Sequence, residues 1–133
     1  MKVVMDASAV LSLLLQTAAA GKVAGRLREA EGNVHAPHLL DVEVAQILRH
    51  HAAAEPSQAD RCRQVLRDLR EMPIIRHPHS DFLDRCWELR NEMTTSDAAY
   101  VALAEFLDAP LLTLNDRLGT QGHNARIELL TKL

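Results

Sequence analysis

The stretch Val3-Val4-Met5-Asp6 places three apolar residues directly before a carboxylate, and an apolar run from Ala7 to Leu15 follows it. A short apolar run that ends at a charge predicts a buried strand, and the longer run, rich in helix formers, predicts a helix. Parallel strands need a crossover between them, and a strand that passes straight into a helix supplies one. The opening of the chain therefore favours an α/β fold.

The rest of the chain repeats this alternation of strands and helices. Further strands are predicted at residues 34–36, 73–76, 111–114 and 127–130, and further helices at residues 22–31, 39–53, 57–71, 80–91 and 97–107. Strands that alternate with helices predict a central parallel sheet with helices on both of its faces. Because 133 residues suit one hydrophobic core and no linker or repeat interrupts them, we expect a single domain spanning residues 1–133.

The composition is that of a globular chain with an aliphatic core: 47% of the residues are hydrophobic, 3% are aromatic, and the net charge is −3. So few aromatic rings exclude base stacking as the main mode of any nucleic-acid binding, and the mild acidity excludes a general polyanion-coating protein. Cys62 and Cys86 lie among apolar residues at helical spacing, which predicts buried free thiols. No apolar run reaches the length of a membrane span, and Asp6 interrupts any signal-peptide pattern, so we expect a cytoplasmic protein without a membrane partner.

Two acidic residues follow predicted strands. Asp6 comes directly after the first strand, and Asp116 lies just past the strand at residues 111–114. In open parallel sheets, ligands bind beyond the carboxyl ends of the strands, so both positions suit a site. Each also has a structural explanation, because Asp6 can cap the helix that follows it and Asp116 can belong to a turn.

Two further acids lie on predicted helices. Glu43 has apolar neighbours one turn before and one turn after it, which predicts a partly buried carboxylate that needs a partner or a metal. Asp97 begins a helix, with Thr95 or Ser96 expected to cap the free amides. The structural explanations are a buried Arg or His partner for Glu43 and a favourable helix dipole for Asp97.

Taken together, the four acids point to a cation. Carboxylates that converge at one sheet edge repel one another and destabilise the fold unless a positive ion lies between them. Oxygen ligands without a companion set of Cys or His favour Mg²⁺ or Mn²⁺. The sequence therefore predicts a divalent metal site formed by Asp6, Glu43, Asp97 and Asp116.

A family resemblance extends over nearly the whole chain. It rests on four motifs in order, Val-Val-Met-Asp6-Ala-Ser-Ala-Val-Leu, Leu-Leu-Asp-Val-Glu43-Val-Ala, Thr-Ser-Asp97-Ala-Ala-Tyr-Val-Ala-Leu-Ala-Glu and Leu-Leu-Thr113-Leu-Asn115-Asp116-Arg-Leu. In these motifs the chain resembles the PIN-domain nucleases, specifically the VapC toxins of bacterial toxin–antitoxin pairs. It departs from the family in having Ser96, where an aromatic residue is frequent, before the third acid. Aligning on Thr113 puts Asn115 in the usual fourth acidic position, which leaves that position open between Asn115 and Asp116.

The resemblance implies a metal-dependent endoribonuclease, the toxin of a type II toxin–antitoxin system, that hydrolyses RNA phosphodiester bonds with Mg²⁺ or Mn²⁺. It implies that Asp6 and Asp97 are direct ligands, while Glu43 binds a second ion or orients the attacking water. Ser8 and Thr113 would hydrogen-bond these ligands. A cognate antitoxin and a homodimer are the implied protein partners.

Two other functions are open. One is a phosphoryl-transfer enzyme or receiver-like domain, but an aspartyl-phosphate phosphatase needs a second Asp two residues after Asp6, where this chain has Ser8. A receiver needs a lysine after a late strand, and the chain has none from Thr113 to Leu130. The other is a catalytically weak or inactive acidic-pocket module that binds nucleic acid, which the uncertain fourth acid leaves open.

Overall fold

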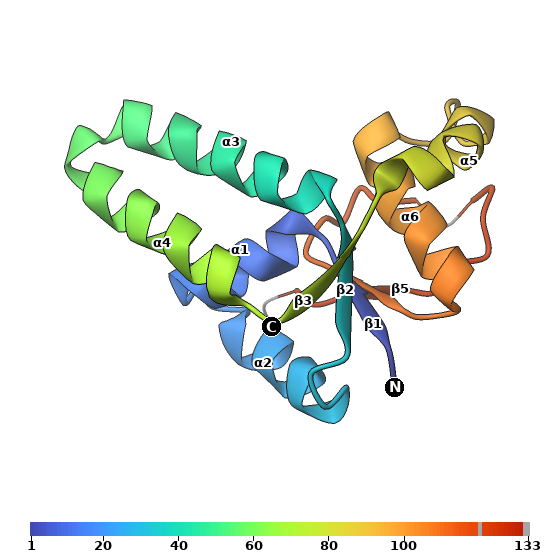
Figure 1. The fold of residues 1–133 in the computed structure, drawn as a ribbon, viewed down its shortest axis with the longest axis horizontal. Coiled ribbons are helices and arrows are strands. Elements are labelled where there is room, and N and C mark those ends of the chain that lie inside the picture. Colours follow the sequence, from blue (N-terminus) through green and yellow to red (C-terminus); the bar gives the residue numbers. More distant parts are fainter. Residues whose placement is uncertain (120, 132–133) are drawn as a thin grey trace.

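The computed structural model describes residues 1–119 and 121–131 and shows a five-stranded sheet in the order β3-β2-β1-β4-β5 (Figure 1). Every neighbouring pair of strands is parallel. The strands are β1 (Val3–Met5), β2 (Val34–Pro37), β3 (Ile74–His77), β4 (Leu111–Thr113) and β5 (Ile127–Leu129). The predicted parallel α/β sheet is confirmed.

Helices cover both faces of this sheet. They are α1 (Ala7–Leu15), α2 (Ala20–Glu29), α3 (Leu39–Ala54), α4 (Ala59–Glu71), α5 (Leu83–Glu88) and α6 (Thr95–Leu107), with 3₁₀ turns at Pro56–Gln58 and His79–Phe82. Helices α1 to α4 pack on one face, and α5 and α6 pack on the other (Figure 1). The molecule is thus three layers with the sheet in the middle.

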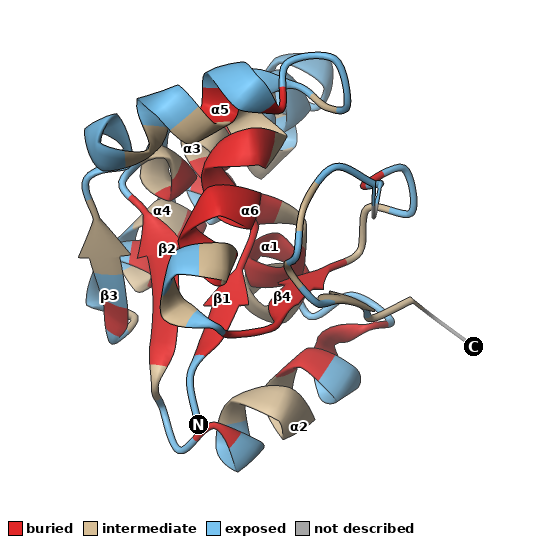
Figure 2. Cartoon of the chain, turned by 90° about the vertical axis from the view of Figure 1, so that its right-hand side faces the viewer, coloured by how far each residue is buried: buried red, intermediate tan, exposed pale blue. Residues whose placement is uncertain are grey.

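The central strand β1 shows how the sheet separates two cores. Its side chains alternate, as a pleated strand requires: Val3 and Met5 join the core under α1 to α4, and Val4 joins the core under α6. All three side chains are fully buried, and Figure 2 shows the buried centre of the sheet behind α6. β1 pairs with β2 on one side and with β4 on the other, so the strand end that carries Asp6 is fixed from both sides.

The predicted helix at residues 80–91 is the main departure from the sequence expectation. The segment forms a 3₁₀ turn followed by the short helix α5, and its apolar residues Leu83 and Trp87 are 56% and 68% exposed. Ile47, expected on the buried face of α3, is also exposed. Helix α2 begins two residues before the predicted start at Lys22. In this segment, apolar residues at helical spacing were expected in the core, but two of them, Leu83 and Trp87, form an exposed apolar surface on α5.

The remaining global expectations concern cysteines and membranes. Cys62 and Cys86 are buried free thiols, as predicted. Within the described residues no single helix is long and apolar enough to cross a membrane, and α1 and α2 meet that criterion only as a pair bent by 110°.

Candidate active site

Asp6 is held at the carboxyl end of β1 by groups from three directions. It is the N-cap of α1, because its Oδ1 accepts a hydrogen bond of 3.0 Å from the Ala9 N–H. The same oxygen accepts one of 2.6 Å from the Ser8 hydroxyl, and Oδ2 accepts one from the Thr113 hydroxyl. Only 9% of Asp6 is exposed. The helix-cap explanation is therefore correct, but it accounts for only part of the bonding of this carboxylate.

A hydroxyl network ties Asp6 to the end of β4. Thr113 is fully buried, and its Oγ1 also accepts from the Asn115 N–H at 2.9 Å. The Ser8 hydroxyl oxygen accepts from the Leu114 N–H, also at 2.9 Å. The two hydroxyls thus bond both to the acid and to the backbone that leaves β4, as the family resemblance implied for Ser8 and Thr113. This double role orients Asp6 rigidly.

Glu43 lies on the first turns of α3, where it is partly buried, as predicted. Its Oε1 accepts a hydrogen bond of 2.5 Å from the Tyr100 hydroxyl on α6. Burial raises the pKa of Glu43, the charges of Asp97 and Asp6 raise it further, and the hydrogen bonds from Tyr100 and Ser96 oppose these effects. Burial is the largest cause of this shift, and the charges of Asp97 and Asp6 add to it.

Asp97 lies in the first turn of α6. The residue that caps this helix is Thr94, whose hydroxyl accepts from the Asp97 N–H at 3.2 Å. The expectation of a cap at Thr95 or Ser96 was wrong, because the last residue with extended backbone before the helix is Thr94. Burial raises the pKa of Asp97, the Thr94 hydrogen bond opposes this effect, and the charge of Asp6 raises the pKa further. Asp97 therefore shares one electrostatic environment with Asp6 and Glu43.

The fourth position lies apart from this cluster. Asp116 is exposed, and its charge is not among the causes of the raised pKa of Glu43 or Asp97. Asn115 is partly buried, and its side-chain oxygen accepts from the Arg117 N–H at 3.0 Å, which closes a tight turn after β4. The structure thus brings Asp6, Glu43 and Asp97 together and leaves Asp116 in the exposed loop after β4.

Comparisons with known proteins identify the family. The model of the PIN domain family matches residues 3–122. This chain belongs to the PIN-domain family. Ribonuclease VapC12 of Mycobacterium tuberculosis is 41% identical over 96% of this chain and 98% of its own length, and Ribonuclease VapC9 of that species is 37% identical over 90% of this chain and 91% of its own. At this identity and coverage, the chain is also a member of the VapC ribonuclease family.

Solved structures agree with this PIN fold. PAE2754 from Pyrobaculum aerophilum superposes with a TM-score of 0.69 at 19% identity, covering 96% of this chain and 83% of its own. A chain in a toxin–antitoxin complex from Klebsiella pneumoniae superposes with a TM-score of 0.65 at 19% identity, covering 99% of this PIN chain and all of its own. Both likenesses concern the fold.

The carboxylates of this PIN domain suit a hard divalent cation by their chemistry. Three carboxylates come from three separate segments; burial raises the pKa of Glu43 and of Asp97, and the charge of Asp6 raises both further. No Lys or Arg is among the causes that act on Glu43 or Asp97, so no side-chain cation offsets their charge there. Among residues 1–119 and 121–131, no three acidic, His or Cys side chains hold a metal-binding arrangement as they stand. Mg²⁺ is commonly held by one or two carboxylates and several waters, which does not require three side chains in contact with the ion.

Tyr100 is the site residue that sequence reasoning missed in this PIN domain. It is buried on α6, one turn after Asp97, and its hydroxyl donates to Glu43 on α3. The signal available was a single polar ring at helical spacing from the third acid, in a chain with few aromatic residues. Burial and the negative charge of Glu43 raise the pKa of Tyr100 far above its ordinary range, so this residue is a fixed donor.

Two of the seven histidines, His35 and His77, form a structural pair away from the acidic site. His35 on β2 and His77 on β3 are joined by a hydrogen bond of 2.8 Å between Nδ1 and Nε2. The other nitrogen of His35 lies 2.7 Å from the side-chain oxygen of Asn33. Burial lowers the pKa of both rings, so they pair in the neutral form. These contacts give His35 and His77 a structural role that links β2 to β3.

Proposed function

We propose that this VapC ribonuclease hydrolyses phosphodiester bonds of RNA with Mg²⁺ or Mn²⁺ held by Asp6, Glu43 and Asp97. One observation supports the proposal most strongly: three carboxylates from separate segments lie close together, so that besides burial the charge of Asp6 raises the pKa of Asp97, and the charges of both raise the pKa of Glu43. Such an arrangement destabilises the folded chain unless a cation or another function offsets it. Membership of the VapC family supplies the substrate class.

Each residue has a distinct task in this mechanism. The bound ion would lower the pKa of a coordinated water and offset charge on the scissile phosphate. Asp6, fixed by Ser8, Thr113 and the α1 amide, presents its remaining lone pairs in one orientation. Asp97 supplies the second carboxylate. Tyr100 immobilises one oxygen of Glu43, and the other oxygen would bind the ion or orient the attacking water.

The fourth position is assigned a lesser role. Asp116 is exposed, and its charge does not contribute to the raised pKa of Glu43 or Asp97. The side-chain oxygen of Asn115 closes the turn. We propose that either residue reaches the ion through water. Substituting Asp116 by Asn then lowers cleavage by a smaller factor than the same change at Asp97.

We further propose that the protein is the toxin of a type II toxin–antitoxin pair, that it acts in the cytoplasm as a homodimer, and that an antitoxin inhibits it. Support comes from family membership and from the Klebsiella pneumoniae structure, which is a toxin–antitoxin complex. Size-exclusion chromatography with light scattering tests the homodimer.

Cleavage of RNA in the presence and absence of Mg²⁺ or Mn²⁺ tests the proposed chemistry. We expect metal-dependent cleavage by the parent chain and a loss in Asp6→Asn that exceeds the roughly 10- to 100-fold typical of removing an outer partner. Asp60→Asn, an acid in the first turn of α4, is the matched control and should cleave at the parent rate. Cleavage that persists in Asp6→Asn would contradict the proposal. Binding of RNA without any cleavage by the parent would support the inactive binding module instead.

A further inference from the structure

Two adjoining hollows over α5 form a groove beside the acidic site. The inner hollow, of about 140 Å³, is lined by residues that include Leu83 on α5 and Ser96, which precedes Asp97 and hydrogen-bonds Glu43. The outer hollow, of about 220 Å³, is lined by Leu83, Trp87 and Arg90 among others. The two hollows share Leu83, Cys86 and Thr95, so they are neighbours. The acids themselves line neither hollow, and Ser96 is the residue that joins the groove to their site.

The groove ends at the only tryptophan of the chain. Trp87 is 68% exposed although it is the largest side chain in a protein with very few aromatic residues. Burying such a ring would contribute more to stability than any other single side chain, so its exposure costs the fold a core residue. Leu83, also exposed, extends the same apolar surface toward the acidic site.

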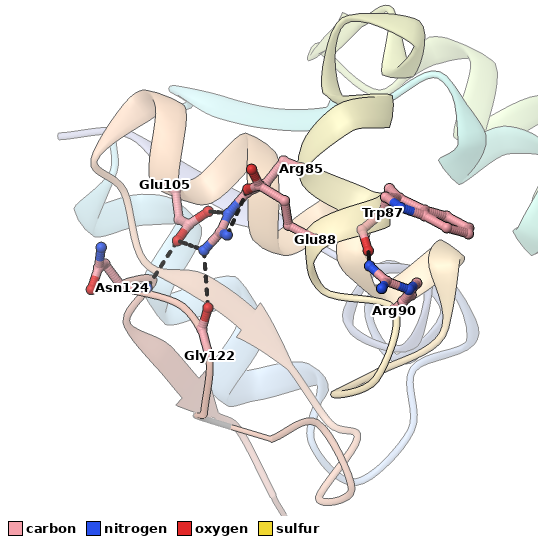
Figure 3. A network of polar contacts seen from close by, with 7 residues as sticks. All are labelled: Arg85, Trp87, Glu88, Arg90, Glu105, Gly122 and Asn124. Atoms are coloured by element: carbon pink, nitrogen blue, oxygen red, sulfur yellow. Dashed lines mark hydrogen bonds and ion pairs between the residues drawn. The ribbon is translucent and has the colours of Figure 1, made fainter.

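An arginine accompanies this ring. The Arg90 guanidinium carbon lies 4.5 Å from the Trp87 ring centroid, and its Nη1 donates to the Trp87 carbonyl at 2.9 Å (Figure 3). Within the described part of the chain Arg90 forms no ion pair. The nearby Arg85, in contrast, is fully engaged with Glu105, Glu88 and the Gly122 carbonyl. Arg85 braces α5 against α6, and Arg90 keeps its charge available.

We propose that Trp87 is a stacking platform for one base of the RNA substrate, next to the scissile phosphate, and that Arg90 contacts the adjoining backbone phosphate. The inference rests on the proposed function and specifies how the substrate is held. The Arg90 guanidinium lies over one face of the Trp87 ring, so a base would stack on the opposite face. An exposed ring with an arginine next to it matches the alternation of base and phosphate in a single strand, and both residues line the outer of the two hollows beside the site. Each hollow is smaller than the roughly 300–1,000 Å³ typical of complete small-molecule sites, which suits a single flat group.

One such platform is compatible with the low aromatic content. A single ring cannot hold a long strand by stacking, but it can fix the position of one base relative to the site. Because every base can stack on a ring, Trp87 would fix the position of the strand without selecting its sequence, and the remaining affinity would come from the ion and from backbone contacts.

The test uses the fluorescence of the sole tryptophan. The probe is a short single-stranded RNA of mixed sequence, added to the Asp6→Asn variant so that the strand stays intact. We expect saturable quenching of the Trp87 emission by this RNA, and little quenching by a strand of the same length with abasic sites. RNA that binds, as judged by the anisotropy of a label on the strand, without altering the emission would overturn the proposal.

Matched substitutions separate stacking from general surface effects. Trp87→Leu should weaken RNA binding by roughly 5- to 100-fold, because stacking on a ring contributes in that range. In the cleaving parent background it should raise KM with little change in kcat, while Trp87→Phe retains most of the affinity. Phe106→Leu removes an equally exposed ring on α6 that lines neither hollow, and should bind RNA as the parent does.

The outcomes also distinguish this inference from the function on which it rests. If the parent chain cleaves RNA and Trp87→Leu binds RNA normally, only the stacking platform is wrong. If the parent neither binds nor cleaves RNA, both proposals fail. An emission that shifts with protein concentration in the absence of RNA would assign this face to a second copy of the chain and contradict the RNA platform.

Discussion

At the scale of single residues, Thr113 shows how the site depends on one buried hydroxyl. The side chain is fully buried, donates to Oδ2 of Asp6 and accepts from the Asn115 N–H. A buried hydroxyl costs free energy unless it is bonded, and here both of its roles are used. The position of the first acid is therefore built into the end of β4.

Replacing this hydroxyl by a methyl group tests that dependence. Thr113→Val keeps the shape of the side chain but leaves a buried carboxylate oxygen and a backbone N–H without their partner. We expect a loss of about 1.5–3 kcal/mol in the free energy of unfolding, measured by urea denaturation, together with slower RNA cleavage. Thr113→Ser retains the hydroxyl and is the control for the network. A valine variant as stable and active as the parent would show that the hydrogen bond is dispensable.

The same scale shows what the sequence could and could not reveal about the site. Asp6, Glu43 and Asp97 were predicted because strand ends and an apolar helix face are readable locally. The bond between Tyr100 and Glu43 spans 57 positions and exists only because the first turns of α3 and α6, which cover opposite faces, come together at the carboxyl end of the sheet. The separation of Asp116 from the cluster likewise depends on the turn that Asn115 closes. Contacts of this kind require the three-dimensional arrangement.

At the scale of secondary structure elements, the strands were readable because each is a short apolar run between polar breaks. The structure of residues 80–91 could not be predicted in the same way. Apolar residues at helical spacing can line an exposed groove as well as a buried core. Only Cys86 and Leu89 of this segment are buried, while Leu83 and Trp87 are exposed. Periodicity alone cannot tell a buried face from an exposed apolar one. The short α5 is held by these two buried side chains and by the ion pair of Arg85 with Glu105 on α6.

The ion pair between α5 and α6 gives a prediction at this scale. Glu105 accepts two hydrogen bonds from Arg85 and one from the Asn124 N–H, and its side chain is 16% exposed (Figure 3). Glu88 contacts Arg85 through a single bond and is 63% exposed. We expect Glu105→Gln to lower the free energy of unfolding at pH 7 by about 1–2 kcal/mol and Glu88→Gln by less than about 0.5 kcal/mol.

The pH dependence of this pair has a definite sign. The hydrogen bonds from Arg85 hold the pKa of Glu105 below its usual value of 4.5. The folded state then binds fewer protons than the unfolded state, so the stabilisation is complete above that value and is lost as the pH falls through the lowered pKa. Urea denaturation of the parent and Glu105→Gln at neutral and acidic pH measures this difference. A gap between them that persists in strong acid would rule out the ionic explanation.

At the scale of the whole molecule, the acidic cluster sets stability against function. Burial and the neighbouring acids raise the pKa of Glu43 above its usual value of 4.5. The folded state therefore binds more protons than the unfolded state, and the metal-free protein loses stability as the pH rises through 4.5 to the raised pKa. The buried negative charges of the site lower the stability of the folded protein, and a bound cation would offset this effect.

Neutralising one acid should stabilise the metal-free protein. Glu43→Gln keeps an oxygen for the Tyr100 hydroxyl and removes the charge. At pH 7 in EDTA we expect it to have a higher unfolding temperature than the parent and a free energy of unfolding larger by on the order of 1 kcal/mol. The gain should disappear below about pH 4. Thermal melting across this pH range measures both. Lower stability than the parent at pH 7 would contradict the repulsion argument.

In Mg²⁺, the parent should become more stable than Glu43→Gln. An ion that binds only the folded parent stabilises it by about 1.4 kcal/mol at ten times its Kd, and the variant should gain less. Melting curves with increasing Mg²⁺ check this expectation. Equal stabilisation of both chains would place the bound ion away from Glu43.

The pairing of β1 with β4 has a consequence for biosynthesis. Thr113, which bonds Asp6, is translated 107 residues after it. At the usual speeds of about 5–20 residues per second, the ribosome needs roughly 5–20 s to cover that interval. During this time the nascent chain can pair β1 with β2 but not with β4. The hydroxyl that orients the first acid therefore arrives last, and we expect no RNA cleavage by the nascent chain before residue 113 has been added.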